Sequence, residues 1–256
     1  MKVLSIAALG MRAQEENVRV IADNIANSST TAFAPGSARL SDLKYATKAV
    51  PQPGPEAGDG LEYFGSGVRV SAIQRDFSQG ALQETGRPLD LAINGPGFFK
   101  LAFPDGRAAY ARAGTFQLSK DGEIVHSNGL PLSSAITIPE EHNEIYIDQA
   151  GNVFSRGADS DVSELQGTIE LVNFAEPNGL RPAGDNMYAF DEAAGDEIDI
   201  EAGNDSFLQQ GYLETSGVDT VRELTELIRA QRMYELNSRV IRTADAMLSA
   251  QTQIIG

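Results

Sequence analysis

Both ends of the chain carry the same apolar repeat, and this repeat limits what the chain can fold into more than any other feature. Near the N-terminus, the repeat follows alternating steps of three and four, which is the spacing of a heptad stripe on one side of an α-helix. Its members are Leu4, Ala7, Met11, Gln14, Val18, Ile21 and Ile25. The stripe ends within residues 24–29, where Asn and Ser favour turns. It predicts a helix of about 24 residues, about 36 Å long.

The C-terminal repeat is longer and follows the same rule. Its members are Leu227, Ala230, Tyr234, Asn237, Ile241, Ala244, Leu248, Gln251 and Ile255, and Ile228, Val240, Met247 and Ile254 widen the stripe. No Gly or Pro lies between Thr220 and Gly256. Glu223, three residues after Thr220, fits a capping box at the start of a helix. We expect one helix of about 35 residues, about 50 Å long.

Two apolar stripes at opposite ends of a chain can be buried in two ways. Pairing them closes a loop around the middle of the chain, and the entropy cost of closure rises only slowly with loop length. The pair can be an intramolecular clamp, or many copies of the pair can pack side by side, and periodicity alone leaves both open. Asn237 and Gln251 either fix the register of the pair or form a solvated edge of the stripe.

The middle of the chain favours short strands joined by tight turns. Strands are expected at 68–72, 89–93, 144–148 and 168–171, with hairpin turns at Asp105-Gly106 and Asp121-Gly122. The expected fold is α+β: long N- and C-terminal helices that pair as a coiled-coil-like unit, a central β-rich domain and an extended Pro/Gly arm. The expected domains are 1–30 with 218–256 (helical), 31–67 (linker and arm) and 68–217 (β-rich).

Residues 46–67 form a segment crowded with proline and glycine. They include Pro51, Pro53, Gly54, Pro55, Gly58, Gly60, Gly65 and Gly67. Such a segment excludes a helix or a central strand, so we expect an extended arm, a linker or an ordered loop. Residues 192–205, rich in Asp, Glu, Gly and Ala, are expected to form a solvated surface loop.

The charge balance excludes several classes of partner. The chain has 20 Lys and Arg against 36 Asp and Glu, a formal net charge of −16. Nucleic acids and anionic membranes are bound by clustered Lys and Arg, so neither is expected as a partner. The acidity serves solubility, or keeps subunits apart before assembly. The chain has no Cys, which excludes a disulfide framework, a thiolate zinc site and a Cys nucleophile.

The N-terminus imitates a signal peptide, with Lys2 before the apolar residues 3–9. That run is short, has no convincing cleavage site and passes directly into the helical repeat. No run approaches the roughly 18 apolar residues that cross a membrane. We therefore expect neither a cleaved signal nor membrane insertion.

No catalytic or metal-binding constellation stands out in the sequence. His126 and His142 are expected in exposed loops, and without Cys they are a weak basis for a metal site. The run Gly95-Pro96-Gly97 lacks the Lys-Ser/Thr of a phosphate loop and is expected to form a turn before a strand. The acidic segment 195–201 lacks the ligand order of an EF-hand. Carboxylate pairs are numerous, but nothing selects one as catalytic. We expect no enzyme activity and no cofactor.

Four blocks of the sequence resemble one protein family. Residues 22–33 resemble the N-x-A-N-x-x-T-x-G/A-F signature of flagellar rod and hook proteins, with matches at Asn24, Ala26, Asn27, Thr30 and Phe33. Residues 78–99 are similar to the family's SQG…TG…LDLAI.G.GFF block, 210–219 to its Q.G.LE.SNVD block, and 228–235 to its I.AQRAYE block. Ala32 stands where the family more often has Gly. Ser29 replaces the commoner Asn or Thr, and Gly217 replaces Asn, a mild change if the position is left-handed.

Within this family, two features resemble the distal rod members. The length matches rod subunits, whereas hook subunits carry a further outer domain. The segment from Tyr45 to Gly60 also lies where distal rod members have a stretch that hook proteins generally lack. Proximal rod or hook-type subunits are the alternative within the family. The arm residues singled out are Tyr45, Pro51, Pro53, Gly54, Pro55 and Gly60.

The resemblance implies a structural subunit that assembles with itself into a hollow, rigid helical tube and transmits torque from motor to hook. Its partners would be proximal rod proteins, the hook protein, the L and P ring proteins and the flagellar type III export apparatus, in the periplasmic part of the basal body. The arm would stiffen the tube by wedging between neighbouring subunits. Self-assembly is assigned to Leu4, Met11, Val18, Ile21 and Ile25, and to Leu227, Tyr234, Asn237, Ile241, Ala244, Leu248 and Ile255.

Two other classes remain open on the residues alone. A secreted β-rich hydrolase or a monomeric adhesin would use the terminal helices only as a clamp. The classes differ in one property. A filament subunit needs its neighbours to bury the helices, so its ends should be disordered when it is alone, whereas an enzyme or adhesin should be ordered throughout.

Overall fold

The computed structural model describes residues 2–51, 59–157, 162–200, 203 and 206–255, with side chains described in those ranges except at residues 2, 46, 48–51, 59–63, 143 and 251–255. The fold is α+β, with a helix at each end and a β-rich middle. The chain divides into two compact units. The helical unit comprises Met1–Ala26, Gly36–Arg75 and Asp219–Gly256, and the β unit comprises Asn27–Pro35 and Asp76–Val218.

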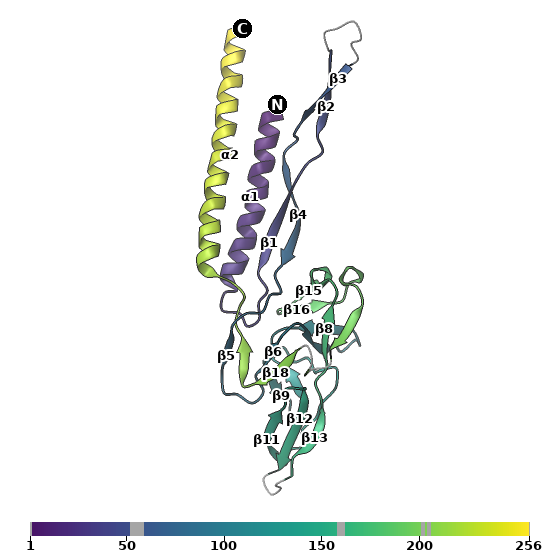
Figure 1. Cartoon of the computed structure of the whole chain (residues 1–256). Helices are drawn as coiled ribbons and strands as arrows, with labels where there is room; N and C mark the ends of the chain where they lie inside the picture. The colour runs from purple at the N-terminus through teal and green to yellow at the C-terminus, as the bar shows by residue number, and fades with distance from the viewer. Residues whose placement is uncertain (1, 52–58, 158–161, 201–202, 204–205, 256) are drawn as a thin grey trace. The chain divides into compact units, whose positions relative to one another are not determined.

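Two long helices dominate the helical unit. Helix α1 spans Lys2–Ala26 and helix α2 spans Thr220–Ile255, of 25 and 36 residues. They pack against each other and run antiparallel, so that both chain ends lie at the same end of the pair (Figure 1). Both predicted helices are therefore confirmed, with nearly the expected lengths. On a different side from α2, α1 packs against strands β1 and β4 (Figure 1).

Among its described residues, the rest of the helical unit contains two antiparallel strand pairs. Strand β1 (Gly36–Asp42) pairs with β4 (Val68–Arg75), and β2 (Ala46–Pro51) pairs with β3 (Asp59–Phe64). The segment 46–67, expected as an extended arm, a linker or an ordered loop, contains the strands β2 and β3, which the sequence analysis did not specify. A ribbon of two strands has only edge strands, so a proline at the end of β2 removes no interior ladder bond. The predicted arm residues Pro53, Gly54 and Pro55 lie outside the described residues.

The β unit is built from short strands in five sheets. A six-stranded sheet has the order β15 (Arg181–Gly184), β16 (Met187–Ala189), β8 (Ala108–Ala111), β7 (Phe98–Ala102), β14 (Leu171–Phe174) and β17 (Glu197–Ile200). A three-stranded sheet comprises β11 (His142–Ile147), β12 (Asn152–Gly157) and β13 (Glu164–Thr168). The strand pairs are β5 (Leu82–Glu84) with β19 (Tyr212–Glu214), β6 (Leu91–Asn94) with β18 (Phe207–Gln210), and β9 (Phe116–Leu118) with β10 (Ile124–His126).

The main core of the β unit lies between these sheets. Its fully buried side chains include Leu91, Ile93, Phe99, Leu101, Ile124, Leu132 and Leu171. The two predicted hairpin turns are confirmed: Gly106 joins β7 to β8 and Gly122 joins β9 to β10, with φ of 84° and 76°, values that favour glycine.

Two predictions in the β-rich region are wrong. The strand expected at 168–171 spans the gap between β13 and β14, since the alternation there belongs to two strands that join different sheets. The solvated loop expected at 192–205 contains the short 3-10 helix η2 (Glu192–Ala194) and the edge strand β17. The acidic side chains of β17 are compatible with an edge, because one side of an edge strand meets solvent.

The start of α2 also differs from the prediction. The carboxylate of Asp219 accepts hydrogen bonds from the backbone N–H groups of Val221 and Arg222, at 3.0 and 3.1 Å. Asp219 is therefore the N-cap, and the expected capping box between Thr220 and Glu223 is wrong. The prediction failed by one residue because Asp and Thr are both good caps and stand next to each other.

The net charge is divided unevenly between the two units. Counted along the sequence, the helical unit has 13 Lys and Arg against 12 Asp and Glu, whereas the β unit has 7 against 24. The helical unit is therefore close to neutral, with a net charge of +1, and the β unit carries −17. A near-neutral surface lets apolar helices approach one another with little electrostatic opposition.

We expect Asp219→Ala to destabilise α2 by about 1 kcal/mol, because two backbone N–H groups lose their acceptor. Thr220→Ala, one residue further on, should have little effect. The thermal midpoint of the helical circular dichroism signal of the polymerised chain, in which α2 is expected to be folded, measures both. Equal midpoints for the two variants would contradict the assignment of Asp219 as the cap.

Candidate functional site: the paired helices and the signature loop

The predicted N-terminal stripe lies on a covered side of α1. Ile21 is buried, and Leu4, Met11, Val18 and Ile25 are half-buried. The sequence analysis missed a second covered side. It borders β4 in a groove lined by Leu9, Arg12, Ala13, Glu16, Val68, Arg69 and Val70. A stripe analysis detects one side of a helix, and this second side is partly made of Ala and of the stems of charged residues.

The predicted C-terminal stripe is the less exposed side of α2. Leu227, Asn237, Ile241 and Ala244 are half-buried, Ala230 is buried, and Tyr234 and Leu248 are 38% and 39% exposed. Ile255 lies outside the residues whose side chains are described. Asn237 lies against Gly10 of α1: a Cβ added to Gly10 would be 2.9 Å from Asn237 Nδ2. The glycine therefore lets the amide approach the α1 backbone closely.

A second apolar row on α2 is exposed. Met233, Leu236, Val240 and Met247 are 44%, 51%, 44% and 69% exposed. Their steps of three, four and seven residues place them on one side of the helix, next to the stripe that is partly covered by α1. We call these four residues the second row. Scattered exposed apolar residues are normal on a protein surface, but a continuous row with heptad spacing is typical of a surface that packs against another helix.

The first family signature turns the chain at the end of α1. Asn24 is 1% exposed; its side-chain amide donates to the carbonyl oxygen of Gly36 and accepts from the Gly36 N–H, both at 2.8 Å. The side chain thus pairs with the backbone at the start of β1 as a neighbouring strand would. After Ala26, Thr30 Oγ1 donates to Asn27 Oδ1 at 3.1 Å. The signature polar residues therefore close a turn.

The end of the signature belongs to the β unit. Ala32 has φ of 50°, and Phe33 is buried. That φ is the left-handed region in which glycine is favoured, which accounts physically for the Gly that the family more often has here. Gly217 has no such requirement: its φ is not positive, so the expected left-handed role is wrong. Its N–H donates to the Phe33 carbonyl at 3.0 Å, and Pro35 Cδ would lie 3.2 Å from an added Cβ.

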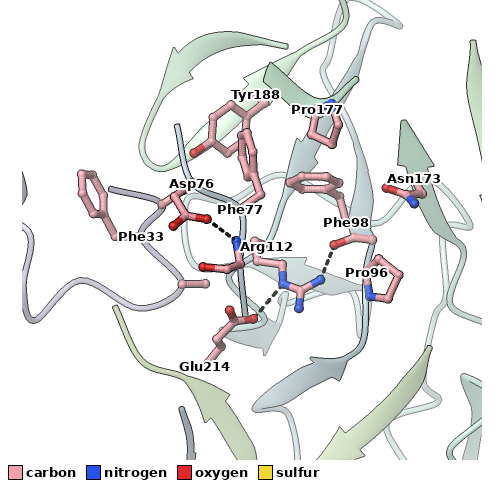
Figure 2. Close-up of a pocket in the computed structure, with 14 residues that line it drawn as sticks. Phe33, Asp76, Phe77, Pro96, Phe98, Arg112, Asn173, Pro177, Tyr188 and Glu214 are labelled. Atoms are coloured by element: carbon pink, nitrogen blue, oxygen red, sulfur yellow. Dashed lines mark hydrogen bonds and ion pairs between the residues drawn. The ribbon is translucent and has the colours of Figure 1, made fainter. Parts of the chain in front are cut away.

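A buried ion pair lies beside this loop in the β unit. Arg112 Nε donates to Glu214 Oε2 at 2.7 Å, and the two side chains are 10% and 6% exposed. The other guanidinium N–H groups donate to the carbonyl oxygens of Gly97, Gly95 and Ile93, at 2.6, 2.7 and 3.1 Å. Figure 2 shows the guanidinium group between Glu214 and the turn that contains Pro96. The glycine-rich turn at 95–97 is confirmed, and its carbonyls serve Arg112.

The sequence analysis did not identify Arg112 or Glu214. Arg112 stands in the run Ala108-Ala109-Tyr110-Ala111-Arg112-Ala113, and one charged residue among small apolar residues is a weak signal of a buried cation. Its partner lies 102 residues further along the chain. Pairing over such a separation cannot be read from one sequence.

The two histidines lie in strands of the β unit. His126 is 3% exposed in β10 and its Nε2 lies 3.1 Å from the Ala113 carbonyl, so the expected exposed loop is wrong; burial lowers its pKa. His142 is half-buried in β11, with Nδ1 2.6 Å from Ser155 Oγ, so it too is not an exposed loop residue. Within the described ranges, no group of three or more His, Asp or Glu residues could hold a metal ion.

The carboxylate of Glu197 binds two groups whose pKa values are raised. Tyr110 donates to Glu197 Oε2 at 3.0 Å, and burial is the main reason why its pKa is raised. Lys100 binds the other oxygen of Glu197 at 2.5 Å, and that hydrogen bond is the main reason why its pKa is raised. Each group is thereby held in the form it has at neutral pH, which is not the pattern of a general acid or base.

The arm residues lie partly within the described structure. Tyr45, just before β2, is 59% exposed, Pro51 ends β2 and Gly60 lies in β3.

In the part of the chain that the structure describes, neither helix has a stretch long and apolar enough to cross a bilayer.

Comparison with known proteins places the chain in a family. Residues 92–155 match the model of the flagellar hook protein FlgE/F/G D1 domain, and residues 209–254 match the model of the flagellar basal body rod FlgEFG protein C-terminal region. The flagellar basal-body rod protein FlgG of Agrobacterium fabrum is 42% identical over 97% of each chain. The chain belongs to the flagellar basal-body rod protein family. Like the other members of this family, it is a structural subunit of the flagellar rod.

Within the family, the FlgG branch fits best. From Caulobacter vibrioides, FlgG is 39% identical over 99% of each chain, whereas FlgF is 31% identical over 90% of this chain and 89% of its own. The FlgG members match almost end to end, so the distal rod assignment is favoured over the proximal one. The hook protein FlgE2 of Helicobacter pylori, a solved structure, aligns with a TM-score of 0.26 and 13% identity over 71% of this chain and 43% of its own, which carries no argument about the fold.

We expect Ala32→Gly to stabilise the β unit by about 0.5–1 kcal/mol, because glycine removes the left-handed strain of an alanine. Ala34→Gly is the matched control: Ala34 is also buried, in the same loop, and its φ is not positive, so the substitution should destabilise. Urea unfolding followed by intrinsic tyrosine fluorescence measures both. A loss of stability in Ala32→Gly would contradict the account.

Proposed function

We propose that the chain is a distal rod subunit that assembles with itself through its terminal helices into a hollow, rigid helical tube and carries torque from motor to hook. The observation that supports this most directly is the second row on α2. α1 partly covers one side of α2 and leaves the second row to solvent, although the spacing of the second row suits another helix. Many copies packed side by side would cover it.

Burial of the second row between neighbouring copies is energetically favourable. Fully burying one Leu or Met side chain stabilises by about 1.5–3 kcal/mol, so the four half-exposed side chains of the second row give each subunit contact a useful gain. α2 also projects past the start of α1 at the end where both termini lie (Figure 1). Met247, near the C-terminal end of α2, is 69% exposed. A neighbouring subunit is the natural cover for it.

The same proposal assigns a role to each of three parts of the chain. The helices 1–30 and 218–256 pair in coiled-coil fashion and line the inner tube, with the self-assembly residues named from the sequence at their contacts. Residues 68–217 form the outer domain. Residues 31–67, with the ribbon β2–β3 at their centre, act as the arm that wedges between neighbouring subunits and stiffens the tube.

The cellular setting is inferred from the family. The subunit leaves the cytoplasm through the flagellar type III export apparatus, without a cleaved signal, and stands in the periplasmic part of the basal body. There it meets proximal rod proteins, the hook protein and the L and P ring proteins. It has no cofactor, no nucleic-acid partner and no membrane insertion. A β-rich hydrolase or an adhesin is disfavoured, because the relatives are structural proteins of the flagellar rod.

Nuclear magnetic resonance of the full chain at low concentration tests the assembly role. We expect random-coil signals for 1–30 and 220–256 beside a dispersed β unit, and protection of the same helices after polymerisation. A monomer with protected helices that does not polymerise at any concentration would contradict the proposal and favour an intramolecular clamp.

We expect Leu236→Asp to raise the concentration needed for polymerisation by at least about tenfold, because an assembled interface would bury an unpaired carboxylate. Gln231→Asp adds the same charge to an exposed position of the same helix outside the second row, and should polymerise nearly as the unaltered chain does. Sedimentation of polymers measures both. Equal effects would remove the second row from the interface.

Deletion of residues 46–60 tests the arm. We expect the shortened chain to polymerise and the polymer to bend more in electron micrographs, because the wedge between neighbours is lost. Polymers as straight as those of the full chain would contradict the stiffening role, while leaving the role of the second row intact.

A further inference from the structure

The chain passes between its two units four times, after Ala26, Pro35, Arg75 and Val218. We call residues 31–35, 76–81 and 214–217 the crossing segments, because these stretches of the β unit stand next to those points. They are far apart in sequence and are joined by backbone hydrogen bonds. These are Ala32 N–H to Glu214 O (2.9 Å), Asp76 N–H to Pro35 O (2.9 Å), Gly217 N–H to Phe33 O (3.0 Å) and Thr215 N–H to Ala81 O (2.8 Å).

The buried pair of Arg112 and Glu214 connects the crossing segments to the turn that leads into β7. Arg112 follows β8 directly in the six-stranded sheet and holds Glu214, which ends β19. The second carboxylate oxygen of Glu214 accepts the Gly80 N–H at 2.8 Å, so two crossing segments meet on one carboxylate. On its other side the guanidinium group holds the turn at 93–97, which enters β7.

A small cavity marks the same place. Its volume is about 80 Å³, and all three crossing segments line it together with Arg112 (Figure 2). Phe77, in the second crossing segment, packs edge-to-face on Phe98 and Tyr188, with ring centroids 5.5 and 5.3 Å away. These aromatic contacts hold the segment against the sheet but fix no direction, whereas the hydrogen bonds of Arg112 do.

We propose that Arg112 is a positioning residue that, through Glu214, fixes the crossing segments as one bundle to the six-stranded sheet. Mechanical load on the six-stranded sheet would then pass to the crossing segments through the hydrogen bonds of Arg112. We call this set of hydrogen bonds the anchor. Without it, the three crossing segments would take up the load as independent loops. This consequence rests on the proposed function, because a subunit bears such load only in a torque-carrying rod. The anchor itself is a property of the single chain.

The chemistry requires arginine at this position. The guanidinium group serves four acceptors, one carboxylate and three carbonyls, which lie around a planar fork. A lysine ammonium offers three donors from one point and cannot serve all four. Arg112→Lys therefore keeps the charge and loses the anchor. Glu214→Gln is a second, milder variant, which keeps an oxygen for the Gly80 N–H and loses the charge.

Amide hydrogen exchange on the full chain tests the anchor. In Arg112→Lys and in Glu214→Gln we expect the amides of Ala32, Asp76 and Gly217 to lose about tenfold to hundredfold in protection, while Leu101 and Ala109 in the core keep theirs. Lys100→Met is the matched control, because it removes an ion pair of the same sheet that touches no crossing segment, and it should leave the three crossing amides unchanged. Uniform loss across the β unit in both variants, or unchanged crossing amides, would overturn the proposal.

The bending of polymers tests the mechanical consequence. We expect Arg112→Lys to polymerise into rods whose persistence length in electron micrographs falls at least about twofold, while Lys100→Met rods stay unchanged. If the amides of Ala32, Asp76 and Gly217 lose protection but the rods keep their stiffness, the proposal that load passes through Arg112 is wrong. A failure of the unaltered chain to polymerise would instead count against the proposed function, and the exchange measurement would still decide whether the anchor exists.

Discussion

The helical unit is governed by one constraint: α2 has more apolar surface than its own chain can cover. α1 covers the side that carries Ala230 and Asn237, and it cannot also reach the second row. α1 is itself occupied on two sides, by α2 and by the β1–β4 pair. Val3 and Ile6 of α1 are also exposed, but the longest row of exposed apolar side chains in the described helices lies on α2. A helix of this kind is stable when further copies supply its environment, which is the situation of a subunit in a polymer.

The family motifs acquire a common physical meaning in this structure. The signature at 22–33 makes the first turn out of α1 and ends on a left-handed residue. The block at 78–99 contains Gly80 and the turn whose carbonyls receive Arg112, and the block at 210–219 contains Glu214 and the cap of α2. All three blocks thus lie where the chain passes between units or where those passages are held. The block at 78–99 also supplies Leu91, Ile93 and Phe99 to the β core, and the fourth block, 228–235, lies within α2.

The two helices and the Asp-Gly hairpins were predictable from the sequence. Contacts between side chains far apart in the chain were not. The heptad stripes gave both helices, because burial along a helix depends only on spacing. The Asp-Gly turns gave their hairpins for a similarly local reason. The cap of α2 was displaced by one residue because two good capping residues are adjacent. The buried positions of His126 and Arg112 escaped prediction, since their partners, Ala113 and Glu214, are chosen by the tertiary fold.

The nesting of the two units has a consequence for the order in which the chain can fold. α1 ends at Ala26 and its partner α2 begins at Thr220, so the pairing contact has one of the largest sequence separations the chain allows. The β unit is also incomplete until residues 207–214 have joined β5 and β6. A chain that emerges from its N-terminus therefore presents an unpartnered amphipathic segment for almost the whole of its synthesis. High contact order makes such a segment late to find its partner, so its apolar stripe stays exposed to solvent until α2 has been made.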